Sequence, residues 1–260
     1  MNHDEPDREE PLSGGLVHGR VVRLGETVRR PAGPWTPTLH ALLTHLAGKG
    51  FPSPKPLGVD ERDREILTFL PGRATALPWP PVLLTLDGVR QVGALLRRYH
   101  DAVADFALPE PAVWMHGPQA LAPGEIVIHG DFGPHNLIWD GDKLTGLIDF
   151  ELARPGRWEE DALFALLRVA HLRPDEATSR KGFAGVPDRR GRVLAFAEAY
   201  GAPAERLMAH AVPVQAAELD RIERLGGAGL EPWATFLRKG LAEEARTELA
   251  WLEANSGRLL

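Results

Sequence analysis

The chain has 260 residues, of which 43% are hydrophobic and 25% charged, and its net charge is -6. This composition is typical of a soluble globular protein with one large or two small domains, and the negative charge disfavours a nucleic-acid-binding surface. Because the chain has no cysteine, disulfides, thiolate catalysis and cysteine-based zinc sites are excluded. No apolar run reaches the length of a membrane span, and residues 1–10 lack a signal peptide's apolar core. We therefore expect a cytoplasmic protein without a membrane or nucleic-acid partner.

The N-terminal part of the chain predicts a tail followed by a small β-rich lobe. Residues 1–12 are acidic and contain two prolines, which favours a mobile tail. Residues 13–72 are expected to form this N-terminal lobe (N-lobe), a β-sheet with one helix. In chain order its predicted elements are a hairpin over 21–28, a helix with Thr36 as N-cap that ends near Gly48, and strands over 57–59 and 66–70.

Residues 73–260 predict a larger, mainly helical lobe. Asp87 is a candidate N-cap because apolar residues follow it at steps of three and four. Two short apolar runs, Ile126–Ile128 and Leu144–Ile148, predict strands. The two parts together predict an α+β fold of two unequal lobes. Further helices are expected at about 159–172, 188–200, 203–224 and 230–255.

The segment Ile126–Phe150, IVIHGDFGPHNLIWDGDKLTGLIDF, carries the chemistry. Asp131 and Asp149 each follow an apolar strand, and Asn136 lies five residues after the first and thirteen before the second. Two carboxylates and an amide at strand ends make an oxygen donor set that suits Mg²⁺ and phosphate, and the extra acid can accept a hydroxyl proton. Two unrelated turns would also explain these residue types, but they would not require both spacings.

This arrangement resembles the kinase catalytic loop and its metal-binding strand. The His-Gly-Asp form resembles the aminoglycoside phosphotransferase and choline kinase-like branch of the bilobal protein-kinase-like fold. The resemblance implies an ATP- and Mg²⁺-dependent phosphotransferase that acts on a small-molecule hydroxyl. It also implies that Asp131 is the catalytic base and that Asn136 and Asp149 bind the metal.

Other segments extend the resemblance over about 14–165. Leu67–Gly72, LTFLPG, looks like the link between lobes, so Phe69 and Leu70 are expected to meet adenine. Asp161 looks like the family's helix-start acid, which with His129 supports the catalytic loop. The alternative for Asp161 is an ordinary first-turn acid favoured by the helix dipole.

The N-lobe departs from the family pattern in its basic residue. Only five of the 30 basic residues are Lys, and none lies on the strand where a kinase carries one. Arg29 or Arg30 can replace it, because Arg can contact phosphate bidentately and strand alternation puts only one of the two in the cleft. Similarity to family sequences favours Arg29 without settling the choice.

The acid that normally pairs with that lysine is also absent. Residues 31–59 contain no Asp or Glu, so the usual Lys–Glu pair cannot form, and His40 or Thr44 are candidates to replace the helix Glu. Gly14 and Gly15 begin a poor match to a Gly-rich phosphate loop and are equally consistent with an ordinary turn.

The segment between Asp149 and Asp161 disfavours a protein acceptor. Its eleven residues contain no Ser, Thr or Tyr and leave no room for a phosphorylation-ordered peptide-binding loop. We expect a small hydroxylated acceptor, aminoglycoside-like, choline-like or sugar-like, bound against the helices between 154 and 250. Glu151 can contact the metal or substrate or be exposed. Acids that could bind a cationic acceptor, each equally explicable as surface charge, are Glu151, Glu218, Asp220 and Glu223.

A second hypothesis is a catalytically inactive relative that binds nucleotide or a partner. It is motivated by the missing Lys–Glu pair and the poor Gly-rich loop. Transfer of phosphate from Mg·ATP to an alcohol separates the two hypotheses, because only the active enzyme performs it.

Overall fold

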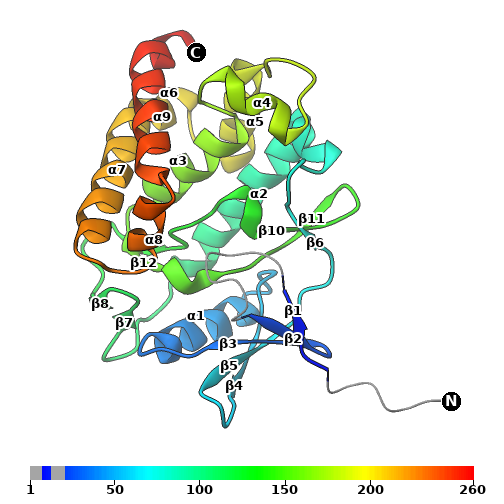
Figure 1. Cartoon of the computed structure of the whole chain (residues 1–260), viewed down its shortest axis with the longest axis vertical. Coiled ribbons are helices and arrows are strands. Elements are labelled where there is room, and N and C mark those ends of the chain that lie inside the picture. The colour runs from blue at the N-terminus through cyan, green and yellow to red at the C-terminus, as the bar shows by residue number, and fades with distance from the viewer. Residues whose placement is uncertain (1–7, 13–20) are drawn as a thin grey trace, which may run out of the picture.

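A five-stranded antiparallel sheet and one helix form the smaller lobe, drawn below the larger helical lobe in Figure 1. The structure, a computed structural model, describes residues 8–12 and 21–260. The strand order of the sheet is β1-β2-β3-β5-β4. Its strands are β1 (Glu10–Pro11), β2 (Val22–Leu24), β3 (Thr27–Pro31), β4 (Pro56–Val59) and β5 (Arg64–Thr68).

The predicted hairpin is confirmed as β2–β3, with Gly25 in the left-handed conformation (φ +57°) that its two-residue turn requires. The tail expected over 1–12 is wrong for β1, which pairs with Val22 and Arg23. Glu9 adds ion pairs to Arg62 and Arg64 at 2.9 and 2.7 Å, so this segment is held to the sheet edge. Residues 1–7 lie outside the described residues.

Helix α1 (Thr36–Gly48) packs against this sheet (Figure 1) because its leucines at 39, 42, 43 and 46 share one fully buried face. Its N-cap is Trp35, not Thr36. Thr36 is the first helical residue, and its hydroxyl accepts a hydrogen bond from Gly33 N at 2.9 Å. The helix boundary is thus one residue earlier than the capping pattern predicts.

The chain leaves the first sheet after β5, and β6 (Arg73–Ala74) pairs with a strand of the larger lobe. That strand, β10 (Leu137–Asp140), also forms a hairpin with β11 (Lys143–Leu147), and this hairpin connects Asn136 to Asp149. Sequence analysis found β11 and not β10, although the Asp-Gly turn between them is a hairpin signal. The remaining strands are β7 (Val113–Trp114), β8 (Gly117–Pro118), β9 (Ile126–Ile128) and β12 (Arg154–Gly156).

Helices α2 (Leu86–Val103) and α5 (Arg189–Tyr200) cross in the core of the larger lobe. Gly93 permits the crossing, because a Cβ there would lie 2.8 Å from the carbonyl oxygen of Phe196. The N-cap of α2 is Thr85, whose hydroxyl accepts from Gly88 N, and the predicted cap Asp87 lies in the first turn. Helix α3 (Trp158–Val169) begins beside the catalytic loop.

Two long helices predicted near the C-terminus are each divided. The expected helix 203–224 is split at His210, and Pro213 fits the first turn of the second part because its missing N–H needs no partner there. The expected helix 230–255 is split at Gly240, which has φ +80°. The remaining helices are α4 (Thr178–Lys181), α6 (Ala204–Ala209), α7 (Ala211–Gly227), α8 (Trp233–Arg238) and α9 (Leu241–Asn255).

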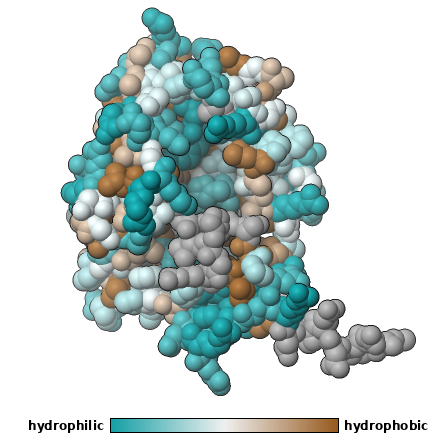
Figure 2. All heavy atoms as spheres, in the orientation of Figure 1, coloured by the Kyte–Doolittle hydropathy of each residue, from teal (hydrophilic) through white to brown (hydrophobic). Residues whose placement is uncertain are grey.

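The face drawn in Figure 2 is mostly hydrophilic, and its hydrophobic residues lie in small separate groups. Exposed large hydrophobics such as Leu57, Leu77 and Val186 lie in different elements and loops. Within the described residues, no helix combines the length and the apolar character needed to cross a membrane.

Candidate active site

A buried carboxylate holds the loop that follows β9. Asp161, in the first turn of α3 and 1% exposed, accepts hydrogen bonds from the backbone N–H groups of His129 (2.6 Å) and Gly130 (2.9 Å). Burial opposes ionisation, but His100 at 3.4 Å and the loop contacts hold the pKa of Asp161 below its ordinary value. Gly130 has φ +78°, and a Cβ there would lie 2.2 Å from Leu152 O, so this turn requires glycine.

His129 connects this loop to the strand end that carries Asp149. Its buried ring places Nε2 3.1 Å from Ile148 O and Nδ1 3.2 Å from Asp131 N. A carbonyl accepts and a backbone N–H donates, so the ring is the neutral Nε2–H tautomer. Burial lowers the pKa of His129, which agrees with a neutral ring. Both expected supports, His129 and Asp161, therefore contact the loop.

The Asp131 carboxylate faces two donors. Asn136 Nδ2 lies 3.1 Å and His135 Nε2 2.9 Å from Asp131 Oδ2. Burial favours the neutral acid, but His135 outweighs it and holds the pKa of Asp131 below its ordinary value. In the same way burial opposes charging of the His135 ring, yet Asp131 raises its pKa. Sequence analysis did not single out His135, whose spacing of four residues from Asp131 was the available signal.

Asp149 lies at the adjacent strand end, in the left-handed conformation with φ +64°, which Asp tolerates better than most residues. Its side chain is 40% exposed. The Ile148 N–H donates to Asn136 O at 3.0 Å, so the two expected metal ligands lie on neighbouring chain segments. Phe150, 1% exposed, packs against the rings of His129 and Tyr99 and fixes the strand end.

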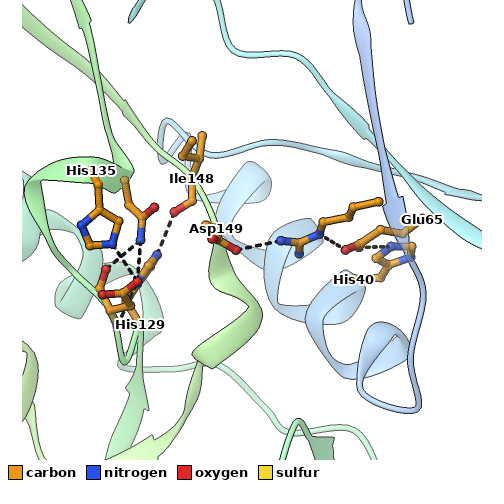
Figure 3. A network of polar contacts seen from close by, with 9 residues as sticks. His40, Glu65, His129, His135, Ile148 and Asp149 are labelled. Carbon is orange, nitrogen blue, oxygen red and sulfur yellow. Dashed lines mark hydrogen bonds and ion pairs between the residues drawn. The ribbon is translucent and has the colours of Figure 1, made fainter. Parts of the chain in front are cut away.

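Arg30 reaches Asp149 from the other lobe. Its Nη1 donates to Asp149 Oδ1 at 2.9 Å and its Nε donates to Glu65 Oε1, while His40 Nε2 lies 3.2 Å from the second oxygen of Glu65 (Figure 3). Glu65 is 1% exposed. Burial opposes its ionisation, but His40 and Arg30 hold the pKa of Glu65 below its ordinary value. A chain of polar contacts thus runs from His40 on α1 through Glu65 on β5 and Arg30 on β3 to Asp149.

Of the two candidate arginines, Arg30 and not Arg29 contacts Asp149. The Arg29 guanidinium contacts Thr27 (2.6 Å) and Asp60 (3.7 Å), on the strand face opposite to Arg30. The acid that pairs with Arg30 is Glu65, directly opposite it on β5. Glu65 lies beyond residues 31–59, the range in which the family pattern places the partner acid.

Of the two expected stand-ins for the helix glutamate, His40 contacts Glu65. For Thr44 there is no hydrogen bond to Arg30 or Glu65 within the described part of the chain. His40 therefore supports the acid of the pair, and Glu65 itself supplies the charge.

Glu151 is half-buried near Arg30 and Asp149. Burial is the main reason why its pKa is raised above the ordinary value. Across residues 8–12 and 21–260, no group of three or more His, Asp or Glu side chains is placed to hold a metal ion alone. A cation at Asp149 would therefore need Asn136, water or a bound phosphate to complete its shell.

Besides the two arginines, the structure describes two of the predicted nucleotide-binding residues, Phe69 and Leu70. Phe69 directly follows β5, and its N–H donates to the carbonyl oxygen of Glu26, in the turn between β2 and β3, at 2.8 Å. Arg23 lies 3.9 Å from the centroid of the Phe69 ring. The Leu70 side chain reaches Gly146 of β11 and bridges the lobes. Gly14 and Gly15 lie outside the described residues.

A cavity of about 150 Å³ lies beside the catalytic loop, between α3 and α7. Glu218 lines it but is paired with Arg221 at 2.7 Å. The side chains of Asp220 and Glu223 are 73% and 46% exposed and pair with surface arginines. Among the acids expected for a cationic acceptor, these two are thus surface charge.

Comparison with known proteins identifies similar chains. A model of the phosphotransferase enzyme family (APH) matches residues 107–205, which include the loop, both strand ends and α3. The trifolitoxin immunity protein of Rhizobium leguminosarum bv. trifolii is 37% identical over 198 residues, 73% of each chain. The homoserine kinase of Rhodopseudomonas palustris is 32% identical over 166 residues, 48% of this chain and 49% of the relative, so the match spans about half of that kinase.

The fold has a counterpart among solved structures. Amicoumacin kinase hAmiN, in complex with AMP-PNP, Ca²⁺ and Ami, superposes with a TM-score of 0.59 at 12% identity. The match covers 96% of this chain and 90% of that kinase. At this identity the likeness establishes the fold alone, and it confirms the bilobal, protein-kinase-like α+β architecture expected from the sequence.

Proposed function

We propose that this protein transfers the γ-phosphate of ATP to a hydroxyl of a small molecule, with Asp131 as the base. The chain belongs to the phosphotransferase enzyme family, whose members include small-molecule kinases. The observation that supports the proposal most is the convergence of Asp131, Asn136 and Asp149 on neighbouring strand ends, with Arg30 and Glu65 opposite.

The donor set fits Mg²⁺. Asp149 keeps Oδ2 free of the Arg30 contact, and Asn136 uses its amide nitrogen on Asp131, which leaves its amide oxygen for a cation. Two protein oxygens with water and phosphate are the usual surroundings of Mg²⁺ in phosphate chemistry. The bound ion would neutralise charge on the phosphates.

Asp131 is the proposed base. Its lowered pKa keeps it ionised at neutral pH, and His135 and Asn136 orient the oxygen that would accept the proton. The acceptor oxygen forms a bond to the γ-phosphorus, the bond from that phosphorus to ADP breaks, and the hydroxyl proton moves to Asp131. The transition state is loose, so positioning matters more than the strength of the base.

Arg30 is the proposed replacement for the usual strand lysine. It is 8% exposed, fixed by Glu65, and directed at the strand end that would bind metal and phosphate. The planar guanidinium keeps its charge at all physiological pH values and can contact a phosphate bidentately. The missing Lys–Glu pair was one reason to consider an inactive relative. The buried Arg30–Glu65 pair supplies a cation and a carboxylate in its place, so this reason no longer holds.

The test is transfer from Mg·ATP across a panel of alcohols, with gain of one phosphate read by mass spectrometry. Asp149→Ala is expected to abolish transfer, and Asp131→Asn to lower kcat by about 10²- to 10⁴-fold. Asp140→Asn, an exposed acid at the far end of β10, is the matched control and should retain full turnover. Unchanged turnover in Asp149→Ala, or no transfer to any alcohol, would refute the proposal.

A further inference from the structure

Arg168, Arg173 and Lys181 lie in the segment from the end of α3 to the end of α4, and we call these three basic residues the cationic cluster. Arg168 and Gln215 line the same cavity, and Gln215 lies 3.4 Å from Glu248, the partner of Arg173. Both arginines also act on the charge of Lys181.

Arg168 lines the cavity beside the catalytic loop without a carboxylate partner. Its guanidinium stacks 3.2 Å from the centroid of the Phe164 ring, and Nη1 donates to Phe164 O at 3.1 Å. Arg154 and Arg221, which line the same cavity, both pair with Glu160 at 2.7 and 3.2 Å. Across the part of the chain that the structure describes, no carboxylate oxygen lies within 4.0 Å of Arg168, so the donors that do not contact Phe164 O remain available to a ligand.

The rest of the cluster is also short of negative charge. Arg173 pairs with Glu248 at 2.8 Å, yet its Nε is buried without a hydrogen-bond partner. Lys181 packs 4.5 Å from the centroid of the Trp79 ring, and burial together with the neighbouring arginines lowers its pKa to about 7. Glu248 is the carboxylate in direct contact with the cluster, through Arg173, and Glu218 and Asp131 act on Arg168 from farther away. A bound anion would give Arg168 the direct partner that it lacks.

The cluster is connected to the loop that presents the proposed base. The Phe164 ring edge lies 3.4 Å from the position of a Cβ on Gly133, two residues after Asp131. Arg168, one helical turn after Phe164, therefore lies under the same loop. An anion bound there would belong to a molecule within reach of Asp131.

Resting on the proposed phosphotransferase function, we propose that the acceptor is a small hydroxy acid whose carboxylate binds Arg168, with Arg173 and Lys181 beside it, while its hydroxyl faces Asp131. Charge-assisted bonds from Arg to carboxylate are short and directional, so they would orient the hydroxyl. A polycationic acceptor would meet like charge at this position.

The test compares matched alcohols that differ in the carboxylate: L-homoserine with 2-amino-1,4-butanediol, D-glycerate with glycerol, and L-serine with serinol. Choline serves as the cationic acceptor and glycerol 3-phosphate as a second anion. We expect kcat/KM to favour at least one hydroxy acid over its neutral partner by about tenfold or more. Preference for choline, the neutral alcohols or the phosphate ester would overturn the proposal and leave the phosphotransferase function standing.

Two variants locate the carboxylate. Arg168→Gln is expected to raise KM for the hydroxy acid by about 10- to 100-fold, the effect of one lost charge-assisted bond, with KM for ATP unchanged. Lys181→Gln should also raise KM for the hydroxy acid. This substitution should disturb folding less, since it removes a half-buried charge. Arg224→Gln, a 65% exposed arginine on α7, is the charge-matched control. An unchanged KM in both folded cluster variants would contradict the assignment.

A binding measurement separates this inference from the proposed function. If no acceptor is phosphorylated, the proposed phosphotransferase function is refuted. The anion site is then still testable, because a ligand that binds the native state raises Tm, so D-glycerate should stabilise the protein in a saturable way. Stabilisation of the wild type that disappears in Arg168→Gln supports the inference. No stabilisation of the wild type overturns it.

Discussion

At the scale of single residues, His135 is the unexpected part of the site. It lies 2.9 Å from the carboxylate proposed as base, yet its side chain is 56% exposed. Each partner stabilises the charged form of the other, so the pKa of Asp131 is lowered and that of His135 raised. The pair keeps Asp131 ionised despite burial, and it also competes with the substrate hydroxyl for the same carboxylate oxygen.

We predict that His135→Gln shifts the acid limb of kcat/KM to higher pH. The variant removes the cation that opposes burial, so the pKa of Asp131 rises and protonation inactivates the base at a higher pH. The measurement is a pH profile with any accepted alcohol, restricted to pH values where circular dichroism shows a folded chain. His210→Gln, an exposed histidine between α6 and α7, is the control. An acid limb at the same pH in both variants would contradict this role of His135.

At the scale of elements, the catalytic loop depends on α3. The carboxylate of Asp161 accepts two backbone N–H groups from the loop and belongs to a residue with 1% exposure. Because its pKa is lowered on folding, its stabilising contribution is present above the ordinary carboxylate pKa and declines as the pH falls toward the folded-state value.

We predict that Asp161→Asn lowers the free energy of unfolding by about 2–4 kcal/mol at pH 7, since an amide cannot accept from both N–H groups. Urea denaturation measures the loss. The difference from wild type should shrink as the pH falls below the ordinary carboxylate pKa of about 4, because Asp161 is protonated there in the unfolded chain first and in the folded chain only at lower pH. Asp101→Asn, exposed on α2, should cost little. A difference that does not depend on pH would show that Asp161 acts by packing alone.

The elements also differ in how far their positions and contacts can be predicted from the sequence. Local patterns identified the hairpin β2–β3, helix α1 and the strand ends around Asp131 and Asp149, because turn residues and apolar periods are encoded within a few positions. The Arg30–Glu65 pair is set by the register of β3 against β5, which joins residues 35 positions apart. No local pattern encodes that register, so alternation could limit the choice to one of two arginines but could not name the acid.

At the scale of the whole molecule, an ion pair connects the two lobes at the proposed active site. Arg30 on β3 of the smaller lobe contacts Asp149 of the larger one at 2.9 Å. Glu65 pairs with Arg30 on the other side, and His40 contacts Glu65. The position of α1 is therefore connected to the proposed metal ligand through His40 and Glu65. Any change that weakens Glu65 should loosen the placement of Arg30 in the cleft, although Arg30 keeps its own charge.

We predict a graded series at this connection. Arg30→Gln is expected to lower kcat by about 10²- to 10³-fold, the effect of removing one donor that stabilises transferring phosphate. Glu65→Gln should lower kcat less, because Arg30 stays tied to Asp149, while its free energy of unfolding falls by about 3–5 kcal/mol as a buried pair is broken. Steady-state kinetics and urea denaturation give the two quantities. Arg29→Gln removes the same charge one residue away, on the opposite face of β3, and should retain kcat within about threefold because it does not reach Asp149. Equal losses of kcat in Arg29→Gln and Arg30→Gln would mean that net charge on β3, and not the contact across the cleft, matters for transfer.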